Sequence, residues 1–310
     1  MHLKMRKTEQ KKAVTVGFFD GVHRGHQYLM QQLRQVAEAR RLEPMVVTFE
    51  QHPRQVLSTD YRPQLLSTPA EKSELLRATG VGQVRVLAFD RTMAALPARD
   101  FMRQVLREEL GAGLLLTGYD NRFGHRCADN ATEGFDDYVG YGCELGIEVV
   151  RALPLSLGNG QNASSSLVRR LLAEGDAEGA AACLGRQYAL SGTVVAGEHI
   201  GHQLGFPTAN LRVDHALKMI PAAGVYAVWA CTAGRRYPAM MNIGTRPTFN
   251  GRQQALEVHI IGFDGDLYGQ DMTVCFVTRL RAERPFDSAE ALAQQLEQDK
   301  QATIKILQKI

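Results

Sequence analysis

The chain has 310 residues, of which 45% are hydrophobic and 22% are charged. This composition is typical of a folded globular protein and excludes collagen-like and intrinsically disordered chains. The 36 Lys and Arg residues against 33 Asp and Glu residues give a net charge of +3. That charge is too small to indicate a nucleic-acid partner. The chain contains no run of about 18 apolar residues, so we expect no membrane span and no membrane partner.

The cysteines number five, an odd count, and none forms a Cys-x-x-Cys pair. This excludes a complete disulfide framework and argues against a zinc ribbon or a thioredoxin-like site. The basic N-terminus lacks the long apolar stretch and the small-residue cleavage site of a signal peptide. We therefore expect a cytoplasmic protein with reduced thiols.

Segments typical of strands and helices alternate in the first half of the chain. The expected strands are Ala13–Phe19, Met45–Phe49, Gln83–Ala88, Leu114–Thr117 and Glu148–Leu153. The expected helices are His26–Arg40, Pro69–Thr79, Ala98–Glu109 and Phe135–Leu145. Strands separated by helices of this length predict βαβ units, and hence a Rossmann-like, doubly wound parallel sheet.

The pattern changes near residue 185. Two short helices, Ser165–Glu174 and Asp176–Leu184, are followed by apolar runs with turn residues between them. The runs are Tyr188–Val195, Val225–Ala230, Tyr237–Ile243, Leu256–Ile261 and Met272–Leu280. They predict an antiparallel β-barrel or sandwich. The last segment, Ser288–Ile310, predicts a closing helix with Asp287 as its N-cap. We predict one domain over residues 1–185 and a second over residues 186–310.

The segment V-G-F-F-D-G-V-H-R-G-H (Val16–His26) joins the first strand to the first helix. A doubly wound sheet binds its ligands at this edge. The segment is neither a G-x-G-x-x-G fingerprint nor a Walker A loop, which argues against a dehydrogenase and a P-loop kinase. His23 and His26 share one face of the helix start, beside backbone N–H groups that attract phosphate. Gly25 lets a ligand approach the backbone.

These features suit nucleotidyl transfer, in which a phosphate attacks the α-phosphorus of a nucleoside triphosphate and pyrophosphate leaves. A pair of capping or metal-binding histidines is the alternative. The pattern G-x-F-D-G-x-H-x-G-H resembles the signature of the nucleotidylyltransferase superfamily. Its flanks resemble one branch, the bifunctional prokaryotic riboflavin kinase/FMN adenylyltransferase family, also called FAD synthetase.

Three further segments of the first domain are similar to elements of that family. They are T-F-E-Q-H-P-R (Thr48–Arg54), G-Y-D-N-R-F-G (Gly118–Gly124) and S-S-S-L-V-R (Ser164–Arg169). Gln51, Asn121 and Ser166 depart from the usual family residues. The resemblance implies that the residues around the nucleotide are Gly17, Phe18, Asp20, Gly25 and Asp120. For Asp120, a structural turn aspartate is the alternative.

Ser164 and Ser165 precede a predicted helix, where hydroxyl and free N–H groups can hold phosphate. Arg169 follows about one turn later and can offer two parallel donors to the β- and γ-phosphates. The alternative is an ordinary capped surface helix with a basic face.

The segment L-G-F-P-T-A-N-L (Leu204–Leu211) predicts a loop shaped by Gly205 and Pro207. The side-chain oxygens of Thr208 and Asn210 lie two residues apart and suit Mg²⁺, which prefers hard oxygen ligands. A turn with local side-chain-to-backbone bonds is the alternative. G-F-P-T-A-N resembles the riboflavin kinase signature of the family. Further similar elements follow in the same order at Pro221–Ala227, Asn242–Phe249, Leu256–His259, Asp266–Gly269 and Leu280–Phe286.

The resemblance implies that Glu257 is the catalytic carboxylate, which takes the proton of the riboflavin 5′-hydroxyl as that oxygen attacks the γ-phosphorus. Strand alternation places Glu257 and His259 on one side. An outward, solvated Glu257 is the alternative. Arg281 matches a flavin-side arginine, and a surface ion pair with Glu283 or Asp287 is its alternative.

His202 and Gly262 stand where the family frequently has arginine and aspartate. The sequence therefore predicts two enzymes in one chain: a kinase that makes FMN from riboflavin with ATP and Mg²⁺, and a transferase that makes FAD and pyrophosphate from FMN and ATP. One retained activity, or a non-catalytic flavin- or nucleotide-binding protein, are the alternatives. We expect small-molecule partners only, and the sequence leaves the oligomeric state open.

Overall fold

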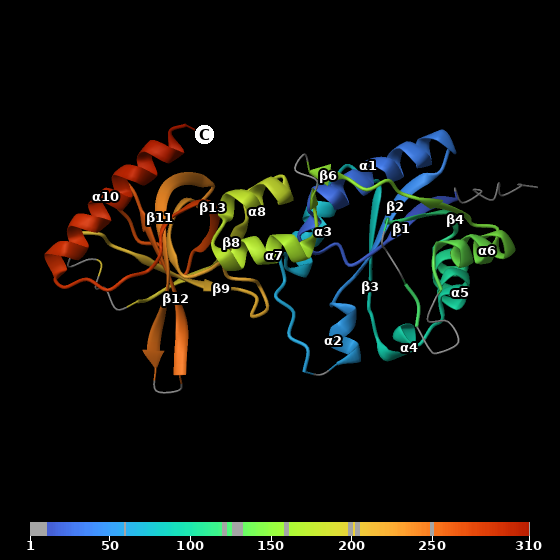
Figure 1. Cartoon of the computed structure of the whole chain (residues 1–310), viewed down its shortest axis with the longest axis horizontal. Coiled ribbons are helices and arrows are strands. Elements are labelled where there is room, and N and C mark those ends of the chain that lie inside the picture. The colour runs from blue at the N-terminus through green and yellow to red at the C-terminus, as the bar shows by residue number, and fades with distance from the viewer. Residues whose placement is uncertain are drawn as a thin grey trace, which may run out of the picture. The chain divides into compact units, whose positions relative to one another are not determined.

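The computed structural model describes residues 11–58, 60–119, 123–125, 133–157, 161–197, 201, 205–248 and 251–309. The chain divides into two compact units, Met1–Ala163 and Ser164–Ile310 (Figure 1). No described helix combines the length and the apolar character that a membrane crossing requires. The domain boundary after residue 185 stays a prediction.

The first unit contains a five-stranded parallel sheet with the order β3-β2-β1-β4-β5. Its strands are β1 (Lys12–Val16), β2 (Glu43–Phe49), β3 (Gln83–Leu87), β4 (Ala112–Thr117) and β5 (Glu148–Arg151). This order confirms the predicted doubly wound fold. The strand order reverses at β1, so the crevice beyond the carboxyl ends of β1 and β4 is the expected place for a ligand. The first strand ends at Val16, three residues before the predicted end.

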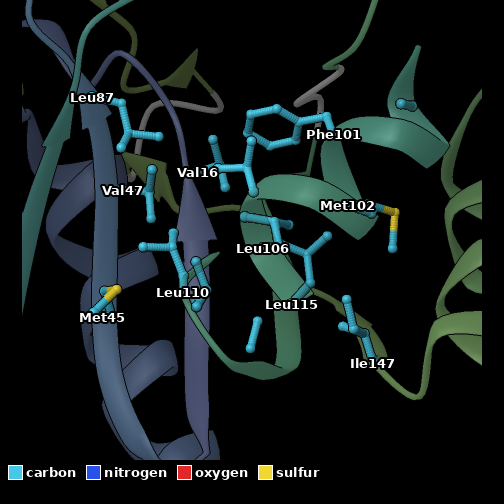
Figure 2. Close-up of a cluster of buried hydrophobic side chains, with 14 of the residues drawn as sticks. Val16, Met45, Val47, Leu87, Phe101, Met102, Leu106, Leu110, Leu115 and Ile147 are labelled. Atoms are coloured by element: carbon cyan, nitrogen blue, oxygen red, sulfur yellow. The ribbon is translucent and has the colours of Figure 1, made fainter. Parts of the chain in front are cut away.

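Two hydrophobic clusters show that helices cover both faces of this sheet. On one face, α1 (Arg24–Ala39) and α3 (Pro69–Ala78) bury Leu29, Leu33 and Leu76 against Ala13 of β1. On the other, α5 (Ala98–Phe101), the π-helix η2 (Met102–Glu109) and α6 (Phe135–Leu145) pack on the sheet. Figure 2 shows this second cluster, to which Val16, Met45 and Val47 of the sheet and Met102 and Leu106 of η2 belong. Burial of two such layers fixes the positions of the strand ends.

Several short elements of this unit were not predicted. They are the 3₁₀ turn η1 (Asp20–Val22), α2 (Pro53–Leu57), α4 (Arg91–Ala94) and the two-residue strands β6 (Ser156–Leu157) and β7 (Gln161–Asn162). The helix predicted over Ala98–Glu109 is present, but after its first turn it widens into η2.

The second unit contains a closed antiparallel barrel with the order β10-β11-β12-β9-β8-β13. Its strands are β8 (Ala189–Val195), β9 (Ala209–Val213), β10 (Gly224–Thr232), β11 (Arg235–Thr248), β12 (Gly251–Ile260) and β13 (Asp271–Arg281). Burial alternates strictly along β8, as expected for a strand with one face toward the barrel interior. The barrel confirms the predicted fold of the C-terminal part, although β9 was read as a loop.

The second unit also contains the helices α7 (Ser165–Glu174), α8 (Ala177–Leu184) and α10 (Ala289–Leu307). Helix α7 has the predicted bounds. Helix α10 lies against β10, β11 and β13, as Figure 1 shows. Its N-cap is Ser288, whose hydroxyl accepts a hydrogen bond from the Ala291 N–H at 3.2 Å. The expectation that Asp287 caps this helix was therefore wrong by one residue.

Candidate active sites

The loop between β1 and α1 has an unusual backbone. Phe19 and Val22 have φ of 54° and 40°, and Gly21 has φ of 74°. The left-handed region is uncommon for side chains with a Cβ and unfavourable for a β-branched residue such as Val22. Strain of this kind persists only where the surroundings fix the backbone, and such positions cluster at functional sites.

Asp20 supplies the bonds that fix this loop. Its carboxylate is 3% exposed and accepts hydrogen bonds from the Leu66 and Ser67 N–H groups at 3.0 Å and from the Ser67 hydroxyl at 3.2 Å. The Gly21 N–H donates to the same Ser67 hydroxyl at 2.9 Å. Asp20 thus ties the loop to the segment before α3. Its predicted contact with the nucleotide stays a prediction.

His23 and His26 are brought together as the sequence predicted. Their rings stack at 3.6 Å between centroids, with 25° between the ring planes. His23 caps α1, because its Nδ1 accepts the His26 N–H at 3.4 Å. Burial, and then the charge of His23, lower the pKa of His26 well below its ordinary value. His26 is therefore neutral near pH 7, and its buried Nδ1 has no hydrogen-bond partner among the described residues.

Two glycines of this loop lie where an added side chain would meet a close neighbour. A Cβ added at Gly25 would lie 3.1 Å from the His23 ring and 3.2 Å from the Ala163 carbonyl oxygen. A Cβ added at Gly17 would lie 2.7 Å from the Phe19 ring. Gly25 thus accommodates the His23 ring and the Ala163 carbonyl, and Gly17 accommodates the Phe19 ring.

Lys72, which contacts Phe18, is a residue of this region that the sequence analysis did not predict. The Phe18 ring meets His52 edge-on at 4.8 Å between centroids, and the Lys72 ammonium lies 3.7 Å from its ring centroid. Lys72 is 2% exposed and donates to the Phe49 carbonyl oxygen at 2.7 Å. Lys72 and the buried Leu76 are four residues apart on α3, a spacing that puts both on one helix face. This helical spacing was the signal in the sequence that could have identified Lys72 as a buried residue.

The element Thr48–Arg54 ends β2 and starts α2. His52 caps α2 by accepting the Arg54 N–H at 3.1 Å. Gln51, the departure from the family pattern, donates to the Phe89 carbonyl oxygen at 3.3 Å. Asp120 and Asn121 lie outside the described residues.

The serine and arginine element lies at the start of α7 in the second unit. Ser164 is the N-cap, and its hydroxyl accepts the Leu167 N–H at 3.1 Å. Ser165 opens the helix, and Arg169, half-buried, follows in its second turn. The predicted helix is confirmed, while the predicted phosphate contacts stay predictions.

Two cavities of the barrel meet at Thr208. The larger, about 620 Å³, is lined by Thr208, Glu257 and Arg281, with Phe286 and Leu292 among its apolar walls. The smaller, about 380 Å³, is lined by Pro207 and Thr208 and by residues 263–268. Thr208 therefore belongs to the walls of both.

Strand alternation around Glu257 is as predicted. Glu257 and His259 line the larger cavity, and Val258 lines the smaller one. Glu257 is half-buried on that cavity wall, and its predicted catalytic role stays a prediction. In the strand register, Glu257 pairs with Asn210 of β9 and with Asn242 of β11. Neither Asn210 nor Gly205 is part of either cavity wall. The Asn210 amide instead packs against Gly197, where an added Cβ would overlap it.

Arg281 lies on the wall of the larger cavity, but its ion-pair partner is neither Glu283 nor Asp287, the two residues considered from the sequence. Its guanidinium forms an ion pair with Asp299 of α10, with Nη2 at 2.8 Å and Nε at 2.9 Å from Oδ2. The two side chains are 17% and 5% exposed, so this is a buried pair and not a surface one. Asp299 was not predicted, although it faces the core four residues before buried Thr303.

His259 fixes the turn that precedes Thr208. Its Nδ1 lies 2.8 Å from the Pro207 carbonyl oxygen, so that nitrogen carries the donated proton. Burial is the largest influence on the pKa of His259, which is lowered. Gly262 has φ of 73°, in the region that favours glycine, which explains the absence of aspartate there. His202 lies outside the described residues.

The structure combines a parallel α/β unit that carries a histidine pair with a barrel that has a carboxylate, an arginine and a threonine at its cavities. This is the architecture that the sequence predicted for a transferase with two activities. Comparison with known families agrees. Residues 5–167 match the family model "FAD synthetase" and residues 184–307 match "Riboflavin kinase". The chain belongs to the bifunctional riboflavin kinase/FMN adenylyltransferase family.

Full-length relatives support both activities. The bifunctional enzyme of Escherichia coli K12 is 38% identical over 290 residues, which cover 92% of this chain and 90% of that one. The Bacillus subtilis enzyme is 33% identical over 308 residues, covering 98% and 95%. A crystal structure described as the macrolide-efflux protein of Streptococcus pneumoniae superposes with a TM-score of 0.85 at 31% identity, covering 94% of each chain.

The protein is thus a riboflavin kinase and an FMN adenylyltransferase, which uses ATP to make FMN and then FAD. The expectation of two activities in one chain is confirmed, and the alternatives of one activity or none are not supported.

Proposed function

We propose that the two activities use separate residues: FMN adenylylation uses the domain predicted over 1–185, and riboflavin phosphorylation uses the barrel. The observation that carries the kinase assignment is that Thr208 lines both barrel cavities, with Glu257 in the larger one. Such an arrangement allows a hydroxyl acceptor and a triphosphate donor to meet at one point, the positioning on which phosphoryl transfer depends.

In the kinase step, riboflavin occupies the larger cavity, where apolar side chains surround its ring system and Arg281 provides a fixed positive charge. The triphosphate of ATP extends toward Thr208 from the smaller cavity. Glu257 accepts the proton of the 5′-hydroxyl as that oxygen attacks the γ-phosphorus, and ADP leaves. The products are FMN and ADP.

Mg²⁺ fits the donors near Thr208. The Thr208 hydroxyl and the Asn210 amide oxygen are hard ligands, and the register places Asn210 beside Glu257. When bound, the ion neutralises the charge of the phosphates. Because the Asn210 side chain packs on Gly197, we assign Asn210 a weaker contact with the ion than Thr208. Gly205 and Pro207 shape the loop that precedes Thr208.

In the adenylyl step, the FMN phosphate attacks the α-phosphorus of ATP and pyrophosphate leaves. We assign the phosphate contacts to His26, whose Nδ1 has no hydrogen-bond partner among the described residues, and to His23, which stacks on it. An anion there raises the pKa of an imidazole and favours the donating cation. Gly25 permits the close approach.

Further residues are assigned by resemblance. Ser164, Ser165 and Arg169 bind the β- and γ-phosphates. The residues assigned to the rest of the nucleotide are Gly17, Phe18, Asp20 and Asp120. We also propose a cytoplasmic location and no nucleic-acid or membrane partner. Free thiols at Cys143, Cys183, Cys231 and Cys275 support a reducing compartment.

Two variants test the assignment of the sites. Each is incubated with ATP, Mg²⁺ and either riboflavin or FMN, and the flavins are separated by chromatography. His26→Ala is expected to abolish FAD formation and to spare FMN formation. Glu257→Gln is expected to abolish FMN formation and to spare FAD formation from supplied FMN.

Exposed neighbours provide the matched controls. Arg24→Ala, in the first turn of α1, and Glu290→Gln, on α10, are expected to change neither activity. Loss of both activities in His26→Ala or in Glu257→Gln, with an unchanged circular dichroism spectrum, would contradict separate sites.

A further inference from the structure

Lys72 joins three parts of the first unit at one buried ammonium group. The side chain comes from α3 and donates to the Phe49 carbonyl oxygen at the end of β2. The same nitrogen lies over the ring of Phe18, in the loop that follows β1. One charged group therefore holds the carboxyl ends of two adjacent strands against a helix. This is the edge of the sheet from which the loop to His23 departs.

A lysine in this position is unfavourable for stability. Burial lowers its pKa to about 8, and the Asp20 charge only partly opposes that effect. An apolar side chain of similar length commonly replaces a buried charge without loss of stability. The next buried residue of α3, Leu76, shows that the surrounding packing is hydrophobic. A charge kept at a cost to stability points to a role in function.

The contacts of Lys72 lead to the histidine pair through the loop backbone. The Phe18 carbonyl oxygen accepts the Thr48 hydroxyl at 3.1 Å, so the Phe18 main chain is held as well as its ring. Two residues later, Asp20 is bonded to the segment before α3. Lys72 and the Asp20 network thus fix the strained loop that ends at His23.

We propose that Lys72, in its charged form, is a positioning residue for FMN adenylylation. It touches no reacting atom. It keeps Phe18 and the end of β2 in place, so that the loop presents His23 and His26 to the phosphates. This inference rests on the proposed location of adenylyl transfer at the histidine pair.

The ionisable groups around the Lys72 ammonium determine which contacts are lost when Lys72 loses its proton. Asp20 faces it from η1, and His52 of α2 contacts the same Phe18 ring. Loss of the proton near pH 8 removes the cation–π contact and the attraction to Asp20. The neutral amine still donates to Phe49. Deprotonation therefore loosens Phe18 while the helix stays attached to β2.

The test compares Lys72→Met with the unaltered enzyme. At neutral pH, FAD formation from FMN is expected to fall by about tenfold or more, as small displacements of catalytic groups do. FMN formation from riboflavin, which the barrel performs in the same chain, is expected to be unchanged, and the melting temperature equal or higher. A merely structural lysine would give a lower melting temperature instead.

The pH profile provides the second readout. FAD formation by the unaltered enzyme is expected to decline as pH rises through about 8, and Lys72→Met is expected to lack this decline. Lys72→Arg, which stays charged, is expected to recover activity without the decline. The matched control is Lys218→Met, because Lys218 is also buried and lies 5.0 Å from a tyrosine ring centroid, at Tyr188 of the second unit. It is expected to leave FAD formation unchanged.

Each outcome has a definite consequence. If His26→Ala abolishes FAD formation while Lys72→Met matches the unaltered enzyme in rate and pH profile, the inference about Lys72 is wrong and the site stands. If His26→Ala still makes FAD, the proposed site fails, and this inference fails with it. If Lys72→Met does not fold, the pH profiles of the unaltered enzyme and of Lys72→Arg decide. The inference is overturned if FMN formation by the unaltered enzyme declines at alkaline pH together with FAD formation. It is also overturned if the decline of FAD formation persists in Lys72→Arg.

Discussion

Two imidazole rings stacked at 3.6 Å cannot both carry a proton at low energetic cost, because their charges repel at short range. In this enzyme the repulsion adds to burial, and both lower the pKa of His26. A phosphate bound at this pair, as we propose, would supply the opposite charge that favours protonation. The same arrangement has a consequence for the stability of the free protein.

We expect the free energy of unfolding to fall as pH drops below about 6.5, the pKa of an unfolded histidine. The lowered pKa means that the folded state binds fewer protons than the unfolded state in that range, so acid favours unfolding. His26 contributes at most about 1.4 kcal/mol per pH unit to this slope. Above pH 6.5 the contribution is constant.

Urea denaturation between pH 5 and pH 8 measures this effect. The variant His26→Gln is expected to have a shallower acid decline than the unaltered enzyme, and both are expected to have the same slope above pH 7. Equal acid slopes for the two proteins would show that His26 is not buried beside a second positive charge.

At the scale of elements, α10 is the helix on which the larger cavity most depends. It supplies Ser288, Leu292 and Leu296 to the cavity wall, and Asp299 to the ion pair of Arg281. Its first turn therefore connects helix stability with the larger cavity. The Ser288 cap satisfies one of the N–H groups that have no partner within the helix.

Ser288→Ala is expected to lower the free energy of unfolding by about 1 kcal/mol, because it removes the N-cap. Asp287→Ala, one residue earlier, is expected to change it by no more than about 0.5 kcal/mol, as an exposed substitution usually does. Urea unfolding followed by circular dichroism provides both values. A larger effect for Asp287→Ala than for Ser288→Ala would show that the helix starts one residue earlier.

Hydrophobic periodicity predicted most of the long helices and strands. Each of them buries one face, and the apolar residues of that face recur at a regular spacing in the sequence. It missed β9, since Gly205 and Pro207 indicate a turn and only one of the five strand residues, Leu211, is buried. It also missed the short helices α2 and α4, whose described residues include none that is buried. Such elements depend on partners elsewhere in the chain.

The candidate sites divide in the same way. His23, His26 and Glu257 stand in local motifs, so their positions were predicted from the sequence. Lys72 and Asp299 were not, because their partners lie in distant segments: Lys72 meets Phe18, and Asp299 meets Arg281. Only the helical spacing to Leu76 and to Thr303 indicated that the two charged residues face the interior.

At the scale of the whole molecule, each unit has its own buried core. The clusters under α1 and under η2 belong to the first unit, and the barrel closes on itself in the second. Each unit therefore has the means to keep its own fold when a residue of the other unit is substituted. We therefore expect substitutions at the two proposed sites to separate the two activities in a single intact chain.

We therefore expect the two inactive variants to complement each other in solution. From riboflavin, ATP and Mg²⁺, His26→Ala alone accumulates FMN, and Glu257→Gln alone makes no flavin nucleotide. Mixed in equal amounts, they are expected to form FAD after a lag, because FMN released by one molecule diffuses to the adenylylation site of the other. The lag shortens as the concentration of His26→Ala is raised. If the mixture forms no FAD while each variant keeps its remaining activity, FMN does not leave the chain that makes it.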